Sequence, residues 1–169
     1  ILPIHIITKG IIAQLFPIAR KFFLCLLERW STINKIWKGG ADMVIGIIGG
    51  GASGMAAALA AAENPNAQVL LFERQARLGR KLQATGNGRC NLTNLHAMEG
   101  GYHGNNPDFA REALNAFNVE ATLGWFRELG LFTVAEASGR VYPYSDQANS
   151  VVDMLRFALE KPNIRIFYG

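Results

Sequence analysis

Apolar runs and glycine-rich turns alternate regularly along the chain from Met43 onward. Residues 44–48 (VIGII) are apolar and mostly β-branched, which is typical of a strand buried on both faces. A glycine turn, an alanine-rich helical stretch over residues 55–63, the helix-ending Asn64-Pro65-Asn66 and a second apolar run over residues 68–72 follow. Strand, turn, helix and strand within about 30 residues predict a βαβ unit of an α/β fold.

Helical patterns dominate the next part of the chain. Asn106-Pro107-Asp108 resembles a helix start, with Pro at the first helical position and Asp near the positive end of the dipole. Residues 109–117 then follow a helical pattern, and residues 119–129 predict a second helix closed by Gly130.

The last part of the chain shows strand patterns as well as a helical pattern. Residues 132–142 predict a hairpin that turns near Ser138-Gly139, and residues 164–168 predict a further strand. Between them, residues 150–160 predict a helix with one apolar face, made of Val151, Met154, Leu155 and Ala158.

The first glycine turn, residues 49–54, carries the spacing Gly49-x-Gly51-x-x-Gly54 between a strand and a helix. In the dinucleotide fingerprint the first glycine permits the tight turn and the second lets backbone approach a pyrophosphate. The third lets helix and strand pack closely, and the helix N-terminus supplies free N–H groups. Glu73 ends the second strand 24 residues after Gly49, where its carboxylate can accept from a ribose diol.

These features predict a dinucleotide site, and the acidic Glu73 disfavours the 2′-phosphate of NADP there. The alternative is a glycine turn with an ordinary packing role and a glutamate that faces water.

A second glycine-rich segment, GRKLQATGNGRCNLTN, covers residues 79–94. Gly86 and Gly88 can bring backbone close to a flat ring system, and the amides of Asn87 and Asn91 offer donors and acceptors. Two basic residues of the segment, Lys81 and Arg89, can offset the charge of a phosphate or a reduced flavin. NAD-binding folds do not ordinarily need such a segment after the second strand. FAD is longer, and its ribityl and isoalloxazine portions must be held beyond the pyrophosphate, so the segment favours FAD over NAD. A solvated basic loop is the alternative.

Three stretches, IIGGGASGMAAALAA, LLFER and GRKLQATGNGRCNLTN, resemble the BaiN/YhiN-like family of bacterial flavoproteins, which are NAD(P)/FAD-dependent, aminoacetone oxidase-like oxidoreductases. The resemblance runs from Met43 to the end of the chain. It implies noncovalent FAD in a Rossmann-like α/β domain of a two-dinucleotide-binding-domain flavoprotein. Family members are much longer, so residues 43–169 are expected to be an incomplete, truncated N-terminal part of the FAD-binding domain.

The resemblance also assigns the cofactor residues. Five residues of the first turn would bind the pyrophosphate: Gly49, Gly51, Ala52, Ser53 and Gly54. Glu73 would bind the adenosine ribose, with Arg74 beside it. The rest of the flavin site would be lined by Lys81, Thr85, Gly86, Asn87, Gly88, Arg89, Cys90 and Asn91.

The expected function is that of a FAD-dependent oxidoreductase acting on a small molecule, with NAD(P)H or the substrate itself as the reductant. Three alternatives stay open: a truncated dinucleotide-binding remnant without turnover, a membrane-anchored respiratory-type flavoprotein, and a flavin-dependent tRNA-modifying enzyme. The pattern identifies no catalytic acid, base or nucleophile, and neither the substrate nor the oligomeric state.

Cysteine and histidine add little chemistry. Cys90 lacks a C-x-x-C partner, and the neighbouring Arg89 is the one hint of a lowered thiol pKa, so a packing role is favoured. His96 and His103 have no partners at metal-ligand spacing, and no metal is expected. Two cysteines form no disulfide framework, which favours a reducing compartment and a cytoplasmic protein.

Residues 1–42 differ from the rest of the chain in their charge and in their apolar pattern. They hold six of the 17 basic and two of the 13 acidic residues, which leaves 11 of each for residues 43–169 and gives no sign of a nucleic-acid surface. Their apolar runs are interrupted by charges before the roughly 18–20 residues that a membrane span needs. Lys38-Gly39-Gly40 can be encoded by a ribosome-binding sequence just before Met43. We therefore expect residues 1–42 to be a translated leader outside the family domain.

Overall fold

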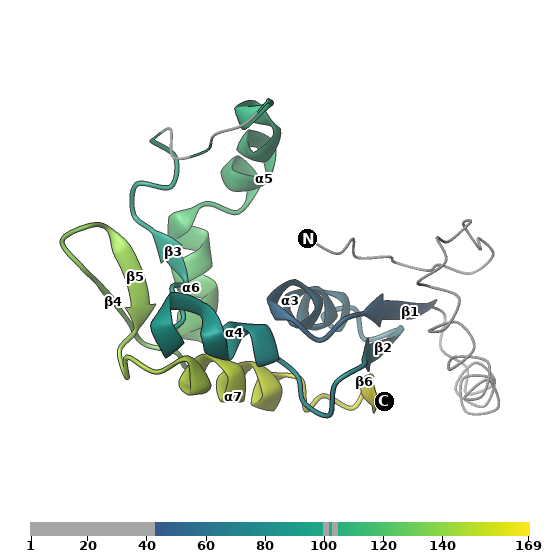
Figure 1. Cartoon of the computed structure of the whole chain (residues 1–169). Helices are drawn as coiled ribbons and strands as arrows, with labels where there is room; N and C mark the ends of the chain where they lie inside the picture. Colours follow the sequence, from purple (N-terminus) through teal and green to yellow (C-terminus); the bar gives the residue numbers. More distant parts are fainter. Residues whose placement is uncertain (1–42, 100–101, 103–104) are drawn as a thin grey trace. The chain divides into compact units, whose positions relative to one another are not determined.

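The computed structural model describes residues 43–99, 102 and 105–169 (Figure 1). The predictions for residues 1–42 and His103 lie outside these residues. The chain divides into two compact units. Within the described residues, the first unit comprises 43–78 and 159–169, and the second comprises 79–158 apart from the undescribed positions.

The first unit is a parallel sheet with one connecting helix. Its strands are β1 (Met43–Ile48), β2 (Ala67–Glu73) and β6 (Ile164–Tyr168), in the order β1-β2-β6. Helix α3 (Ala52–Ala61) joins β1 to β2 and lies beside both strands (Figure 1). The predicted βαβ unit and the last strand are therefore confirmed. The helix begins three residues before the predicted Met55, because the turn residues already form its first turn.

The core of this unit lies between α3 and the sheet. Ile47, Val69 and Leu71 are buried in neighbouring strands, and Met55 and Leu59 are buried on the helix. Each such side chain contributes about 1.5–3 kcal/mol through its burial. On β1, Ile47 is buried and its neighbours are only partly buried or exposed, so the expected burial of both faces fits β2 better.

The second unit contains an antiparallel sheet of three short strands. They are β3 (Thr93–Asn94), β5 (Arg140–Pro143) and β4 (Thr133–Ala135), in the order β3-β5-β4. Strands β4 and β5 form the predicted hairpin. Gly139 has a left-handed φ of 79°, and a Cβ atom there would meet His96 Cδ2 at 2.5 Å.

Helices make up most of the remaining second unit. Asn118 caps α6 (Val119–Glu128) by accepting from the backbone N–H of Ala121, as expected of an N-cap asparagine. The helix predicted after Asn106 is present as a 3₁₀ turn followed by a short α-helix. The remaining elements are α4 (Arg80–Ala84), η1 (Thr85–Gly88), η2 (Pro107–Ala110), α5 (Arg111–Ala116) and α7 (Ala148–Ala158).

One expectation about the second unit needs correction. On α7, Val151 and Leu155 are buried as predicted, but Met154 and Ala158 are only partly buried. Val152 and Leu159 are buried instead, because the buried stripe lies to the other side of Val151 and Leu155. Residues 79–94, for which a solvated loop was the alternative, form a short helix, a 3₁₀ turn and a strand, and half of them are exposed.

Candidate functional site: two glycine turns

The first glycine turn connects β1 to α3, and its first residue still bonds to β2. Gly49 adopts φ +99°, a left-handed conformation that glycine reaches without steric cost. Its N–H donates to the carbonyl of Phe72 at 2.7 Å, and the N–H of Gly50 donates to Glu73 Oε2 at 2.7 Å. The predicted role of Gly49 in the tight turn is thereby confirmed.

Steric space explains the other glycines of this turn. A Cβ atom on Gly54 would lie 1.8 Å from the carbonyl oxygen of Gly49, and one on Gly50 would lie 2.2 Å from Leu78 Cδ2. A Cβ atom on Gly51 would meet nothing within 4 Å. Gly54 therefore permits close packing as predicted, whereas Gly51 borders open space. The role of Gly50 was not predicted, because its only signal in the sequence is its place in three consecutive glycines.

The N-terminus of α3 is available to an anion. Gly51 is the N-cap, and within the described part of the chain no side chain caps the helix and its first turn holds no acidic residue. The first N–H groups of any helix lack intrahelical acceptors, and the dipole is positive there. Ala52 and Ser53 in this turn are exposed. The open space at Gly51 and the uncapped N–H groups fit a pyrophosphate.

Glu73 lies at the end of β2 and has a second role that the sequence did not predict. Oε2 accepts from Gly50, and Oε1 accepts from the N–H of Gln75 at 2.7 Å. The carboxylate thus holds the glycine turn to the end of β2. Each of its oxygens keeps a lone pair for a further donor. Arg74 beside it is exposed.

The second glycine turn, residues 85–91, belongs to the other unit and has an unusual backbone. Gly86, Asn87, Gly88 and Cys90 all have positive φ, at 57°, 55°, 81° and 61°. Asparagine tolerates this region better than most residues, but cysteine does not. Backbone hydrogen bonds close the turn: the N–H of Cys90 donates to Thr85 at 3.0 Å, and the N–H of Arg89 donates to Gly86 at 3.1 Å.

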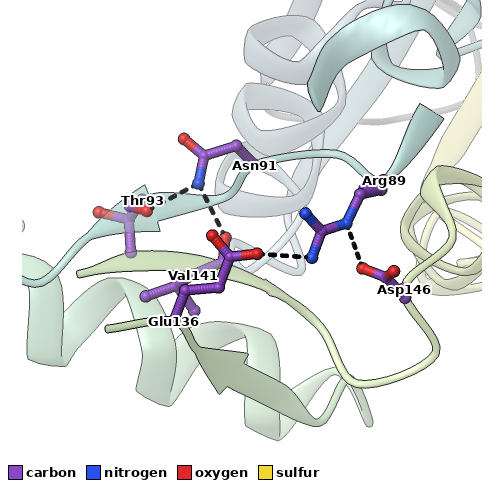
Figure 2. Close-up of polar contacts among 6 residues, drawn as sticks. All are labelled: Arg89, Asn91, Thr93, Glu136, Val141 and Asp146. Carbon is purple, nitrogen blue, oxygen red and sulfur yellow. Dashed lines mark hydrogen bonds and ion pairs between the residues drawn. The ribbon is translucent and has the colours of Figure 1, made fainter. Parts of the chain in front are cut away.

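Several residues at this turn are exposed, and one of their side chains also bonds to backbone groups of the chain. Lys81 on α4, Asn87 and Gly88 are exposed. The Nδ2 group of Asn91 donates to the carbonyls of Thr93 and Val141, both at 3.0 Å (Figure 2). The amide of Asn91 therefore ties the turn to β5.

Arg89 points into its own unit, toward two carboxylates (Figure 2). Its Nη2 donates to Glu136 Oε1 at 2.9 Å, and its Nε donates to Asp146 Oδ1. The guanidinium also lies over the ring of Tyr142, 3.8 Å from the centroid. The hydrogen bonds to Asp146 and then Glu136 raise the pKa of Arg89 above its ordinary value. The sequence analysis missed these three partners.

Cys90 is buried, with 2% of its surface exposed. Burial raises the pKa of its thiol, although a hydrogen bond with Thr85 acts in the opposite direction. The hint that Arg89 lowers this pKa was wrong, because the guanidinium is engaged by carboxylates. A buried thiol with a raised pKa is a poor nucleophile, which agrees with the packing role.

The candidate residues therefore fall into two groups. The residues assigned to the pyrophosphate and ribose share the first unit: Gly49, Gly51, Ala52, Ser53, Gly54, Glu73 and Arg74. The residues assigned to the rest of the flavin share the second: Lys81, Thr85, Gly86, Asn87, Gly88, Arg89, Cys90 and Asn91.

Among the described residues, no three His, Cys, Asp or Glu side chains are grouped so that they could hold a metal ion. His96 contacts Glu99 at 3.0 Å on the surface. Within the same residues, no helix has both the length and the apolar character needed to cross a membrane.

Comparison with known proteins extends this description. The chain is 50% identical over 126 residues to a 3-dehydro-bile acid delta(4,6)-reductase of Clostridium scindens, covering 74% of this chain and 31% of the relative. It is 36% identical over 118 residues to a ribosomal RNA dihydrouridine synthase of Escherichia coli, covering 70% of this chain and 29% of the relative. The chain thus spans about a third of the length of the curated relatives it matches.

The fold comparison finds THI4 of Thermovibrio ammonificans, at 17% identity and a TM-score of 0.48, covering 93% of this chain and 48% of the other. This score is too low to support the fold assignment, which rests on the parallel sheet and on a family match. Residues 43–169 match the model of the HI0933-like protein Rossmann domain. The family expected from the glycine segments is confirmed, and the chain belongs to the HI0933-like Rossmann family.

Proposed function

We propose that this chain binds FAD and forms the flavin-binding part of a cytoplasmic oxidoreductase. The observation that carries the proposal is the first glycine turn. Open space at Gly51, uncapped N–H groups at the start of α3 and a carboxylate at the end of β2 stand together there. This combination suits the pyrophosphate and adenosine ribose of a dinucleotide. Membership of a family with reductase relatives favours a flavin over NAD.

The proposed roles follow the two groups of residues. The first turn binds the pyrophosphate through backbone N–H groups, and Glu73 accepts from a ribose hydroxyl through its remaining lone pairs. For the second turn we propose contacts to the ring system, to which exposed Asn87 would offer an amide and Gly88 its backbone. Bound flavin would supply the hydride or electron transfer, and the chain's own residues bind and orient it.

The substrate we propose is a small molecule, with NAD(P)H or the substrate as reductant. The relative at 50% identity is named as a 3-dehydro-bile acid delta(4,6)-reductase, so an alicyclic ketone that is conjugated with ring double bonds is the first substrate to test. The relative at 36% identity is named for ribosomal RNA. Equal numbers of acidic and basic residues in 43–169 give no support to an RNA surface on this part of the chain.

Flavin titration of the purified 169-residue chain tests the cofactor proposal. We expect FAD fluorescence to be quenched on binding, and FMN to bind at least about tenfold more weakly. FMN lacks the adenosine half, which the first turn and Glu73 are proposed to bind. Equal affinity for FAD and FMN would contradict the assigned roles of the first turn. A chain that stays colourless after incubation with FAD would contradict the function itself.

A further inference from the structure

Arg89 in the second glycine segment is paired with acidic side chains of the chain itself. Two carboxylates surround one guanidinium, so its positive charge is balanced locally. Glu136 lies in the β4–β5 hairpin region and Asp146 in the segment between β5 and α7, 47 and 57 residues further along the chain. Tyr142 on β5 lies under the guanidinium plane. Figure 2 shows Arg89 turned toward both acidic groups.

These contacts join backbone segments that need support. Arg89 lies between Gly88 and Cys90, which both have positive φ, and Asp146 has φ +56°. Left-handed conformations are sterically costly for residues other than glycine. Such conformations persist only where surrounding contacts fix them. A planar guanidinium with two fixed donors and a ring beneath it can supply that fixation, whereas a flexible ammonium cannot.

We propose that Arg89 is a positioning residue: through Glu136, Asp146 and Tyr142 it fixes the second glycine turn in the shape that binds flavin, and it is not the charge partner of the cofactor. This inference rests on the proposed function for its flavin role. The positioning role and the charge-balancing role predict opposite effects on FAD binding when a carboxylate is removed. If Arg89 balanced the charge of FAD, removing a nearby carboxylate would free it and tighten binding. If Arg89 positions the turn, removing a carboxylate weakens binding.

Neutralising each carboxylate tests this sign. Asp146→Asn suits the test, because asparagine also tolerates the left-handed backbone at this position. We expect Asp146→Asn and Glu136→Gln each to weaken FAD binding at least about fivefold, and Arg89→Gln to weaken it about tenfold or more. The double variant Arg89→Gln/Asp146→Asn should bind no more weakly than Arg89→Gln, because both changes remove one contact. Unchanged or tighter binding in the carboxylate variants would overturn the proposal.

Arg89→Lys adds a charge-conserving test. Lysine keeps the positive charge but loses the two-pronged geometry and the flat stacking surface. We expect FAD binding by Arg89→Lys to stay close to that of Arg89→Gln. Recovery of parental affinity would show that charge alone is needed and would contradict positioning by geometry.

Cys90 provides a readout that needs no flavin. It is buried beside Arg89 in the same turn, and the chain holds two cysteines, so Cys25→Ser leaves Cys90 as the single thiol. In that background we expect Arg89→Gln and Asp146→Asn to speed labelling of Cys90 by dithionitrobenzoate about tenfold, because the turn opens. Arg156→Gln is the matched control, since it removes an exposed arginine that contacts Asp153 at 3.5 Å in the same unit.

The two proposals fail in different ways. If the parent chain binds no FAD but the Arg89 and Asp146 variants expose Cys90, the proposed function and the flavin role of Arg89 are wrong, while its support of the turn stands. If the chain binds FAD but neither variant changes the labelling rate, the positioning role is wrong. Circular dichroism spectra matching the parent chain would show that faster labelling reflects local opening and not unfolding.

Discussion

The two glycine turns are fixed in different ways. In the first, residues 49–54, the constraints come from backbone and steric contacts of the βαβ unit: Gly54 against the Gly49 carbonyl, and Gly50 against Glu73. In the second, residues 85–91, positive φ angles recur and side chains from distant segments hold the turn. The first turn is a property of a local motif, whereas the second depends on the tertiary fold of its unit.

This difference has a consequence for ligand binding. Even before any ligand binds, Gly50 and Gly54 are required by neighbouring atoms and Gly49 by its left-handed backbone, whereas a Cβ atom on Gly51 would meet open space. In the second turn Gly86, Asn87 and Gly88 are exposed, while the side chains of Arg89 and Asn91 bond to other groups of the chain. Substitutions can therefore separate effects on folding from effects on binding in both turns.

The largest expected loss of stability is that of Gly54→Ala. The new methyl group would lie 1.8 Å from the Gly49 carbonyl oxygen, so the turn or the helix must move. We expect the free energy of unfolding to fall by about 3 kcal/mol or more, at the upper end of the range for overpacking. Urea denaturation of the parent and variant chains measures it. A loss below about 1 kcal/mol would show that the turn adjusts easily and is not sterically fixed.

The first turn could be predicted from the sequence because its partners lie at fixed offsets. Gly49, Gly51, Gly54 and Glu73 all belong to one strand–helix–strand unit, whose spacing follows from the pattern of apolar runs. The position of Gly50 against Leu78 was not predictable in this way, because Leu78 lies beyond the second strand. Sequence periodicity does not indicate where the chain after a strand returns.

The second turn was identified as a candidate site but not understood. Its composition indicates an unusual backbone, and Gly86 and Gly88 indeed have positive φ. The partners of Arg89 could not be found, because Glu136 and Asp146 follow it by 47 and 57 residues with no local pattern linking them. In the sequence, an arginine in a polar segment suggests a charge that is available to the cofactor. In the structure, the charge of Arg89 is paired with Glu136 and Asp146.

Gly86→Ala is the corresponding test in the second turn. Alanine would pay roughly 1–2 kcal/mol for the left-handed backbone. Its Cβ atom would also lie 2.8 Å from the backbone nitrogen of Asn91 and 3.2 Å from Tyr142 Cε1. We expect a total loss of about 2–3 kcal/mol in urea denaturation. Gly88→Ala is the control, because φ is +81° there but a Cβ atom meets only Gln83 O at 3.9 Å, so about 1 kcal/mol should be lost. Equal losses would mean that backbone conformation alone fixes this turn.

Glu73→Gln tests the link between the first turn and β2. The carboxylate accepts from Gly50 and Gln75, and an amide can accept from only one of them while its NH₂ group faces the other donor. We expect a loss of about 1.5–3 kcal/mol in the free energy of unfolding, which is typical for a hydrogen bond to a charged group. Glu63→Gln, at an exposed position just after α3, is the control. If both variants are equally stable, Glu73 does not support the turn.

Burial of Cys90 predicts a smaller, pH-dependent effect. Because the folded state raises the thiol pKa, it binds the thiol proton more tightly than the unfolded state does. The contribution of Cys90 is therefore complete below the ordinary thiol pKa and declines as the pH rises from about 8.5 toward the raised value. In the Cys25→Ser background, Cys90→Ala should lose less stability between pH 7 and pH 10 than its parent. Parallel pH profiles of the two variants would show that the thiol titrates alike in both states.

Gly51→Ala has the smallest expected effect on stability and the most direct bearing on the cofactor. Its Cβ atom would meet nothing within 4 Å, and Gly51 has an ordinary extended backbone with φ −79°. We expect the free energy of unfolding to change by no more than about 0.5 kcal/mol. FAD binding should nevertheless weaken about tenfold or more, because a methyl group would occupy the space that a pyrophosphate needs. Fluorescence titration and urea denaturation of the same preparation separate the two quantities. Unchanged FAD affinity with unchanged stability would show that the pyrophosphate does not approach this glycine, and the open space at the turn would then need another occupant.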